Sequence, residues 1–301
     1  GNTLMAYEFA ALGAALCWTF AALLAGDLSK QLGGITFNRL RNVGVFVVLV
    51  IGVSLAGLWP TINSGQLGII LLSGLIGIAV GDSFLFATMK RLGPRRAQIL
   101  YACNAPISVL LGVVFLGESL NLLGFLGICL VFVGVVAAIM WGRPNTGGNP
   151  LHSWETTEGI LLVAIGMGLM SALGQSLGAI IIKPVLEAGA HPIAVSALRV
   201  GVSAGLLTAL FYLKSIEPRQ TITRKHWILS GLNGVLAIGI GVTLLLYAFS
   251  IGDVGIASIL SSTQAVMMLP IIWWKTRQRP ANGAWIGAIL VVIGMALIFS
   301  R

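Results

Sequence analysis

The sequence predicts an all-α integral membrane protein in which ten transmembrane helices form two inverted five-helix repeats around a central cavity. Three observations predict this class: the composition, the length of the apolar runs and an internal repeat. Hydrophobic residues make up 57% of the chain and charged residues only 9%, against about a quarter in a soluble domain. The apolar runs are continuous, whereas a membrane β-barrel needs alternating strands of about ten residues.

Ten apolar runs, bounded by proline, glycine or charged residues, define the predicted helices. Each has about twenty residues, which is enough helix to cross the hydrocarbon core of a bilayer. The predicted spans are Glu8–Gly26, Asn38–Leu58, Leu67–Met89, Ala97–Leu116, Leu122–Trp141, Glu158–Ile182, Pro192–Leu213, Trp227–Phe249, Ile256–Trp274 and Ala281–Phe299. The N-terminus lacks the basic region of a secretory signal, so we expect the first span to be retained.

The second half of the chain repeats the first with an offset that drifts from 153 to 160 residues. At the larger offset Ala97–Leu100 corresponds to Ala257–Leu260, and Asn104 corresponds to Gln264. Each copy holds five spans, and an odd number makes the second copy enter the membrane from the opposite side. Such inverted repeats are typical of secondary transporters.

The repeat divides the chain into three parts. These are a first five-span repeat over residues 1–141, a linker over residues 142–157 and a second, inverted repeat over residues 158–301. The linker, GRPNTGGNPLHSWETT, is the longest polar stretch and is rich in Pro, Gly and Asn, as loops are.

Basic residues gather on one side of the predicted bundle. The first, third, fifth, seventh and ninth connections carry 15 of the 18 Lys and Arg residues, with Arg39 and Arg41 counted in the first. By the positive-inside rule both termini lie outside the cytoplasm, and we expect a bacterial inner membrane. The basic residues behind the net charge of +9 then face the cytosol and the lipid headgroups, so no nucleic-acid partner is expected.

Neither a metal nor a cofactor is expected. The three cysteines lie inside apolar runs without paired spacing, and the three histidines are isolated in connections. The many glycines, such as Gly174 and Gly178, fit close helix packing and lack the strand-then-helix context of a nucleotide-binding loop.

Polar side chains fall near the middle of the fourth and ninth spans. Asn104 and Gln264 occupy equivalent positions, each about eight residues, or roughly 12 Å of helix, from the start of its span. Tyr101 lies one turn from Asn104, and Ser261 opens the polar run before Gln264. We interpret these residues as lining a central substrate cavity; the alternative is an interhelical amide clamp.

Asp82 is the acid placed well inside a predicted span, and an ionisable residue at that depth predicts a functional role. It is a candidate to bind an ammonium group or to relay a proton. A structural ion pair with the basic residues of 90–96 is the alternative.

Six further side chains are candidate substrate contacts, although each alone more often serves packing. The aromatic candidates are Trp18, Phe86 and Tyr247, and the polar candidates are Gln175, Asn233 and Thr243. Together they indicate a site for an amphipathic organic solute.

The fourth and fifth spans resemble a known family. Asn104-Ala105-Pro106, the twelve residues from Pro106 to Glu118, and a glycine-rich final span ending GVVAAI resemble the duplicated domain of the drug/metabolite transporter superfamily. Val266 and Gln278 depart from that pattern in the second copy. Among ten-span exporters of this superfamily, the chain looks like the bacterial aromatic amino acid exporters. The resemblance implies a cavity lined by the third, fourth, eighth and ninth spans.

We therefore expect a monomeric exporter, not an enzyme, that moves amino acids or related small metabolites and drugs by alternating access. Two alternatives stay open. A nucleotide-sugar or lipid carrier would need basic residues deep in the cavity, and Arg41 and its counterpart Arg199 come closest. A membrane-embedded lipid-modifying enzyme would need a nucleophile with a base or a metal cluster.

Overall fold

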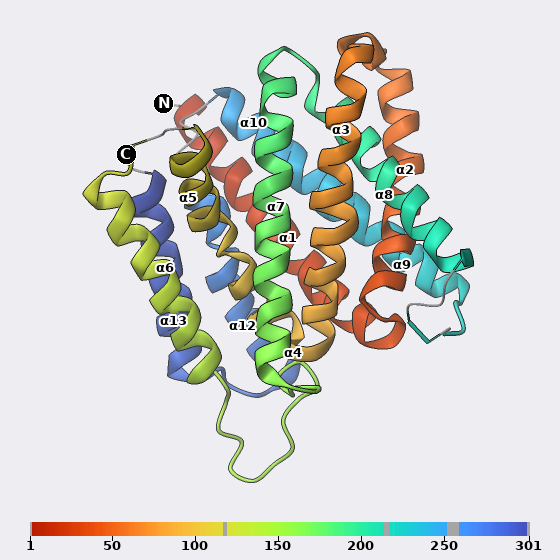
Figure 1. The fold of residues 1–301 in the computed structure, drawn as a ribbon. Helices are drawn as coiled ribbons and strands as arrows, with labels where there is room; N and C mark the ends of the chain where they lie inside the picture. The colour runs from red at the N-terminus through yellow and green to blue at the C-terminus, as the bar shows by residue number, and fades with distance from the viewer. Residues whose placement is uncertain (1, 117–118, 214–216, 219, 252–258, 300–301) are drawn as a thin grey trace.

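The computed structural model describes residues 2–116, 119–213, 217–218, 220–251 and 259–299, which form helices joined by turns and loops, with no strand among them. Figure 1 shows the helices packed into one bundle. In chain order they are α1 (Asn2–Leu32), α2 (Gly34–Leu55), η1 (Trp59–Thr61), η2 (Ser64–Gln66), α3 (Leu67–Gly74), η3 (Leu75–Asp82), α4 (Ser83–Tyr101), α5 (Asn104–Leu116), α6 (Leu122–Met140), α7 (Leu161–Glu187), α8 (Pro192–Leu213), α9 (Arg224–Gly234), η4 (Val235–Val242), α10 (Thr243–Ile251), α12 (Gln264–Thr276) and α13 (Asn282–Phe299).

Eight helical stretches of the described chain are long and apolar enough to cross a membrane, and the apolar helix over Asn104–Phe115 is shorter. The all-helical, multi-pass class is therefore confirmed. The predicted ninth span, Ile256–Trp274, begins at residues outside the described ranges, so the count of ten stays a prediction.

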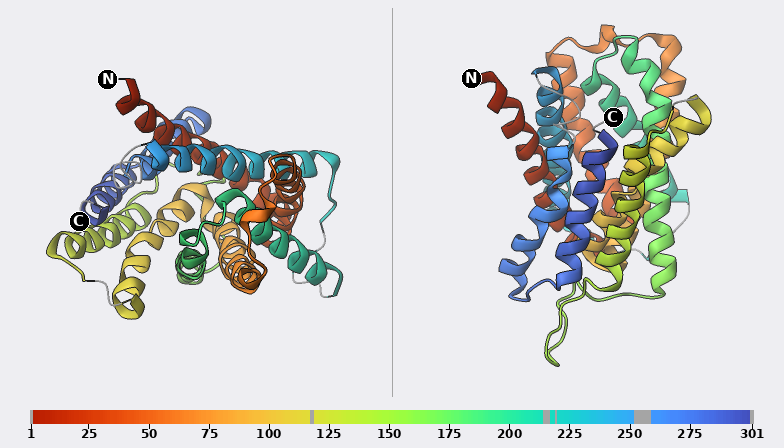
Figure 2. Two further views of the ribbon diagram at one scale, coloured as in Figure 1. Left: turned by 90° about the horizontal axis from the view of Figure 1, so that it is seen from above. Right: turned by 90° about the vertical axis from the view of Figure 1, so that its left-hand side faces the viewer.

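Helices α6 and α13, the last helices of the two halves, lie side by side at one end of the bundle (Figure 2). They are antiparallel, since Gly127 faces Gly294 and Gly134 faces Gly287. A Cβ atom at Gly127 would lie 2.6 Å from the carbonyl oxygen of Gly294, and one at Gly134 would lie 2.7 Å from that of Gly287. The glycines therefore let the two backbones approach each other closely.

The third and fourth spans are joined differently from the prediction. Gly93 has φ 80°, which interrupts the helical geometry within Ser83–Tyr101, and Pro94 starts the next helical piece. A second interruption falls at residues 102–103, before α5. The prediction of one continuous helix over Ala97–Leu116 is therefore wrong.

Two π-helices, η3 and η4, have eight residues each and start 160 residues apart, at Leu75 and Val235. Both directly follow an α-helix, α3 and α9 respectively, and directly precede another. π-Helical turns are rare and are frequently found at functional sites. Their matching positions agree with the repeat in the sequence, although nothing in the apolar pattern predicts them.

Arg39 and Arg41 belong to helix α2, and their assignment to a connection is wrong. Gly33, with φ 88°, precedes α2, and the Glu217 carboxylate accepts hydrogen bonds from the backbone N–H groups of Ile35 and Thr36, at 3.1 and 3.0 Å. The helix therefore begins before both arginines, which are only 6% and 7% exposed.

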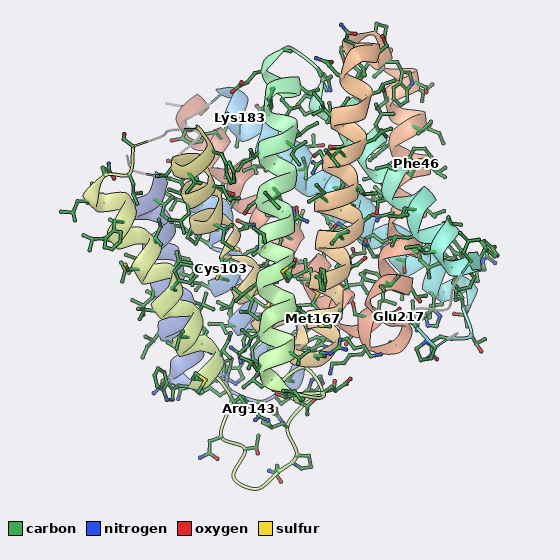
Figure 3. The ribbon with its side chains drawn as sticks, viewed as in Figure 1. Phe46, Cys103, Arg143, Met167, Lys183 and Glu217 are labelled. Atoms are coloured by element: carbon green, nitrogen blue, oxygen red, sulfur yellow. The ribbon has the colours of Figure 1, made fainter. Side chains whose placement is uncertain are left out.

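The predicted linker extends from the end of the bundle marked by Arg143 in Figure 3, which is opposite the start of α1 and the end of α13. Its later residues pack against the helices. Arg95 donates to both carboxylate oxygens of Glu155, each at 2.8 Å, and both side chains are buried. Trp154 is 1% exposed, and its indole N–H donates to Asp27 at 2.6 Å. Residues 154–155 are thus part of the packed structure.

Candidate functional site

A cavity of about 490 Å³ lies among residues drawn from both halves of the chain. Its walls come from the predicted third, fourth, eighth and ninth spans and also from α1, α2, α7, α8 and α13. Nine of the eleven predicted site residues line it: Trp18, Asp82, Phe86, Tyr101, Asn104, Gln175, Asn233, Ser261 and Gln264. Residues far apart in the sequence thus converge on one space.

Asp82, the last residue of η3, is 8% exposed and holds the charged centre of the cavity. One carboxylate oxygen accepts a hydrogen bond from Arg41 Nη1 at 2.8 Å, and the other accepts one from the Gln175 side-chain amide. Arg199 also attracts this carboxylate electrostatically. The ion pair considered from the sequence therefore exists, but its partner is Arg41 on α2 rather than the basic run at 90–96.

Arg199, on α8, packs against two glycines of the neighbouring α3–η3 segment. A Cβ atom at Gly77 would lie 3.0 Å from Arg199 Nη2, and one at Gly74 would lie 2.5 Å from the Arg199 carbonyl oxygen. Small residues at 74 and 77 therefore make room for both the backbone and the guanidinium group. Arg41 and Arg199 both line the cavity.

Neither arginine is among the site residues predicted from the sequence. Both follow a leucine at corresponding positions of the two halves, in the pairs Leu40-Arg41 and Leu198-Arg199, inside apolar runs. A charge inside a span is the same signal that singled out Asp82. Gln98 also lines the cavity but is not a predicted site residue, because it stands beside the basic run at 90–96, which the charge pattern places in a connection.

Asn104 and Gln264 each begin a helix after an interruption. α5 starts at Asn104 after the turn at residues 102–103, and α12 starts at Gln264 after the turn residue Thr263. The hydroxyls of Ser262 and Thr263 donate to backbone carbonyls three residues earlier, at 2.7 and 2.6 Å. They satisfy carbonyls near the interruption, as broken membrane helices require.

Figure 3 labels Cys103, which lies near the middle of the bundle, directly before α5. The backbone carbonyl of Asn104 accepts a hydrogen bond from the Ser176 hydroxyl at 2.8 Å. The start of α5 is thus held by α7, and Asn104 also borders the cavity.

Two aromatic side chains, Trp18 and Phe86, line the cavity. The Trp18 indole N–H donates to the Ala237 carbonyl in η4 at 2.9 Å. Phe86 is 4% exposed, packs edge-on against Phe37 with ring centroids 4.6 Å apart, and carries the Arg41 guanidinium 5.3 Å from its ring centre. These contacts fix the ring planes that a solute would meet.

Thr243 and Tyr247 do not line the cavity. The Thr243 hydroxyl donates to the Gly239 carbonyl, and Tyr247 is 51% exposed. Both lie on α10, directly after η4, and the wider turn of a π-helix changes the direction of the side chains that follow it. Asn233 does line the cavity, but its amide already donates to the Ala21 carbonyl at 2.6 Å.

Several polar atoms of the lining residues are buried without a hydrogen-bond partner among the described residues. They are Nε of Arg41, Nε of Arg199 and the side-chain carbonyl oxygens of Gln98 and Gln264. Buried polar groups in proteins are normally satisfied, so these atoms are candidates for partners that a solute or water would supply.

The described residues contain no group of three His, Cys, Asp or Glu side chains that could hold a metal ion. What they do present is a polar cavity with aromatic walls inside a multi-pass helical bundle. The fold and the cavity define a membrane carrier for small molecules. A family model described as "EamA-like transporter family" matches residues 5–140 and 161–300, and the chain belongs to this family.

Two curated relatives share part of the sequence. A protein of Caenorhabditis elegans named "Adenosine 3'-phospho 5'-phosphosulfate transporter 1" is 25% identical over 126 residues, which are 39% of this chain and 29% of the nematode protein. The match thus spans less than a third of that relative. An "Uncharacterized transporter in cobO 3'region" of Sinorhizobium sp is 28% identical over 134 residues, which are 43% of this chain and 94% of that protein. The family and both relatives are transporters.

A solved structure, described only as "Crystal structure of protein", superposes on this chain with a TM-score of 0.67. The superposition covers 98% of this chain and 96% of the other at 17% sequence identity. This likeness concerns the fold alone.

Proposed function

We propose that the chain is a secondary transporter that exports amino acids, chiefly aromatic and other amphipathic ones, together with related small metabolites or drugs. The observation that carries this proposal is the cavity, which combines aromatic walls, neutral amides and two arginines around one carboxylate. Its volume of about 490 Å³ lies within the usual range for small-molecule sites.

The lining groups suit the carboxylate, the ammonium group and the side chain of an amino acid. An arginine fork binds a carboxylate through two parallel hydrogen bonds, and Arg199 and Arg41 are the cations in reach. The Gln264 carbonyl oxygen and the Asp82 carboxylate can accept hydrogen bonds from an ammonium group. Trp18 and Phe86 offer aromatic faces to an aromatic or aliphatic side chain.

The proposed architecture has ten spans in two inverted repeats, the first over residues 1–141 and the second over residues 158–301. The matching positions of η3 and η4, and of the interruptions before Asn104 and Gln264, support it. Movement of one repeat against the other would expose the cavity to each side in turn. We place the protein as a monomer in a bacterial inner membrane, with both termini outside the cytoplasm.

A carrier of nucleotide-sugars or other phosphorylated solutes is the second candidate. Arg41 and Arg199 favour it, because both line the cavity. Asp82 disfavours it, since its carboxylate compensates one arginine and leaves little positive charge for several phosphate charges. A lipid-modifying enzyme has less support still, because the described lining residues include no histidine or cysteine to act as a base or nucleophile.

The test is flux of radiolabelled phenylalanine into liposomes that contain the purified protein. We expect saturable flux, reduced at least about tenfold by Asn104→Ala or Gln264→Ala, because each removes a polar contact from the cavity. Gly205→Ala, where an added Cβ meets no atom within 4 Å, is the control for handling of the variants. Flux that neither substitution changes would contradict the site, and competition by a nucleotide-sugar would favour the second candidate.

A further inference from the structure

The charges of the cavity are not distributed symmetrically between the two halves. The arginines correspond, since Arg41 and Arg199 follow equivalent leucines and both line the cavity. The acid does not correspond: 160 residues after Asp82 stands Val242, which also lines the cavity. The repeat thus retains two cations and a single carboxylate among the described lining residues.

The Asp82 carboxylate forms a salt bridge with one of the two arginines, Arg41. The Asp82–Arg41 distance is 2.8 Å, with side chains only 12% and 9% exposed, and Gln175 holds the second carboxylate oxygen. Arg199 forms no salt bridge among the described residues, although Asp82 attracts it electrostatically. Opposite charges at low exposure interact strongly, so Arg41 is neutralised far more completely than Arg199.

Together these groups give the described lining a formal excess of one positive charge. The excess charge can pair with the carboxylate of a zwitterionic solute, whose ammonium group has the Gln264 carbonyl oxygen and the Asp82 carboxylate as acceptors. A second anionic group would enter without a partner cation and would also face the Asp82 carboxylate. Burying an uncompensated charge is strongly unfavourable. Discrimination of this kind works by repulsion as much as by attraction.

We propose that Asp82 is a specificity-determining residue, which restricts the cavity to solutes with one anionic group by neutralising one of its two arginines. This inference rests on the proposed function, because it concerns the solutes of the same cavity. Removing the negative charge of Asp82 leaves two uncompensated arginines, so the cavity then favours solutes with two or more negative charges.

The experiment compares tyrosine with O-phosphotyrosine, which share a skeleton and differ by a phosphate of about −1.5 to −2 charge. Binding of radiolabelled tyrosine to the purified protein, and its displacement by O-phosphotyrosine, gives the affinity ratio. We expect the wild type to prefer tyrosine at least about tenfold, and Asp82→Asn to shift the ratio at least about tenfold toward O-phosphotyrosine.

A second variant keeps the test decisive if Asp82→Asn folds poorly. Val242→Asp adds a carboxylate at the corresponding position, removes the excess positive charge and is expected to weaken tyrosine binding and abolish O-phosphotyrosine binding. Glu187→Gln removes a carboxylate that is 65% exposed and lies outside the cavity, and it is expected to leave the ratio unchanged.

The outcomes separate this inference from the proposed function. If the wild type prefers tyrosine but neither cavity variant changes the ratio, the role of Asp82 is wrong and the proposed function stands. A wild type that prefers O-phosphotyrosine also contradicts the role of Asp82 and supports a carrier of phosphorylated solutes. If wild type and variants bind neither probe, amino acid transport is contradicted and the inference with it.

Discussion

Trp18 and Gln175 make equivalent hydrogen bonds, each from one half of the chain to the π-helix of the other half. The Trp18 indole donates to the carbonyl of Ala237 at 2.9 Å, and the Gln175 amide donates to the carbonyl of Gly77 at 2.8 Å. The two acceptors are 160 residues apart, one in each π-helix. Each π-helix is therefore held by the first helix of the other half, and both contacts lie at the cavity.

We predict that Trp18→Phe destabilises the protein by about 1–3 kcal/mol, because an aromatic side chain is kept while the hydrogen bond from the indole to the Ala237 carbonyl is lost. The measurement is thermal unfolding of the purified protein in detergent. Trp274→Phe is the control, since Trp274 is 72% exposed, and it is expected to change stability by less than about 0.5 kcal/mol. Equal unfolding temperatures for the two variants would contradict this role of Trp18.

Gly178→Ala is expected to destabilise the contact between α7 and η3. The added Cβ would lie 3.0 Å from Gly77 Cα and 3.2 Å from the Ser73 carbonyl oxygen, so the two backbones would have to separate. Overpacking of this kind costs about 1–3 kcal/mol. Gly166→Ala, on the same helix, meets no atom within 4 Å, and should be neutral or stabilising. The measurement is the unfolding temperature of each variant. A lower unfolding temperature for Gly166→Ala than for Gly178→Ala would contradict the close contact at Gly178.

Gly93→Ala tests whether the linker packs against the bundle. Gly93 has φ 80°, and an added Cβ would lie 1.8 Å from the Trp154 carbonyl oxygen. We expect a loss of roughly 3–5 kcal/mol from backbone strain and displacement of the linker. Gly57→Ala shares the positive φ, at 64°, but meets no atom within 4 Å, so about 1–2 kcal/mol is expected there. Similar losses at both sites would mean that the linker is not packed at Gly93.

Glu155→Ala leaves Arg95 buried without its carboxylate partner. Because the two side chains are only 1% and 3% exposed, we expect a loss of about 3–5 kcal/mol. Glu187→Ala breaks a pair with Lys183 whose side chains are more than half exposed, and should cost less than about 1 kcal/mol. Unfolding in denaturant measures both, and a loss at Glu155 no larger than that at Glu187 would be inconsistent with a buried pair.

Local or repeated signals in the sequence single out several residues that line the cavity. The offset of 160 residues identifies Asn104 and Gln264, and the charge inside an apolar run identifies Asp82. Both signals come from the physics of the bilayer, in which a polar group needs a protein or aqueous partner. The structure brings these residues to one cavity.

Other features depend on tertiary contacts that no single stretch encodes. Asp82 pairs with Arg41 across 41 residues of sequence, while the basic run next to it pairs with the linker instead. The π-helix η4 turns Thr243 and Tyr247 away from the cavity, and hydropathy does not distinguish a π-helix from an α-helix. The close contact of Gly77 with Gly178 likewise joins segments that are far apart in the sequence.

The most direct test of the central claim, that this cavity opens to each side of the membrane in turn, is accessibility of Ser261→Cys. The variant is made with Cys17, Cys103 and Cys129 replaced by alanine and is placed in liposomes. A membrane-impermeant thiol reagent is then applied from either side. We predict modification from both sides, with phenylalanine changing the two rates in opposite directions. Modification from one side only, with and without phenylalanine, would contradict alternating access through this cavity.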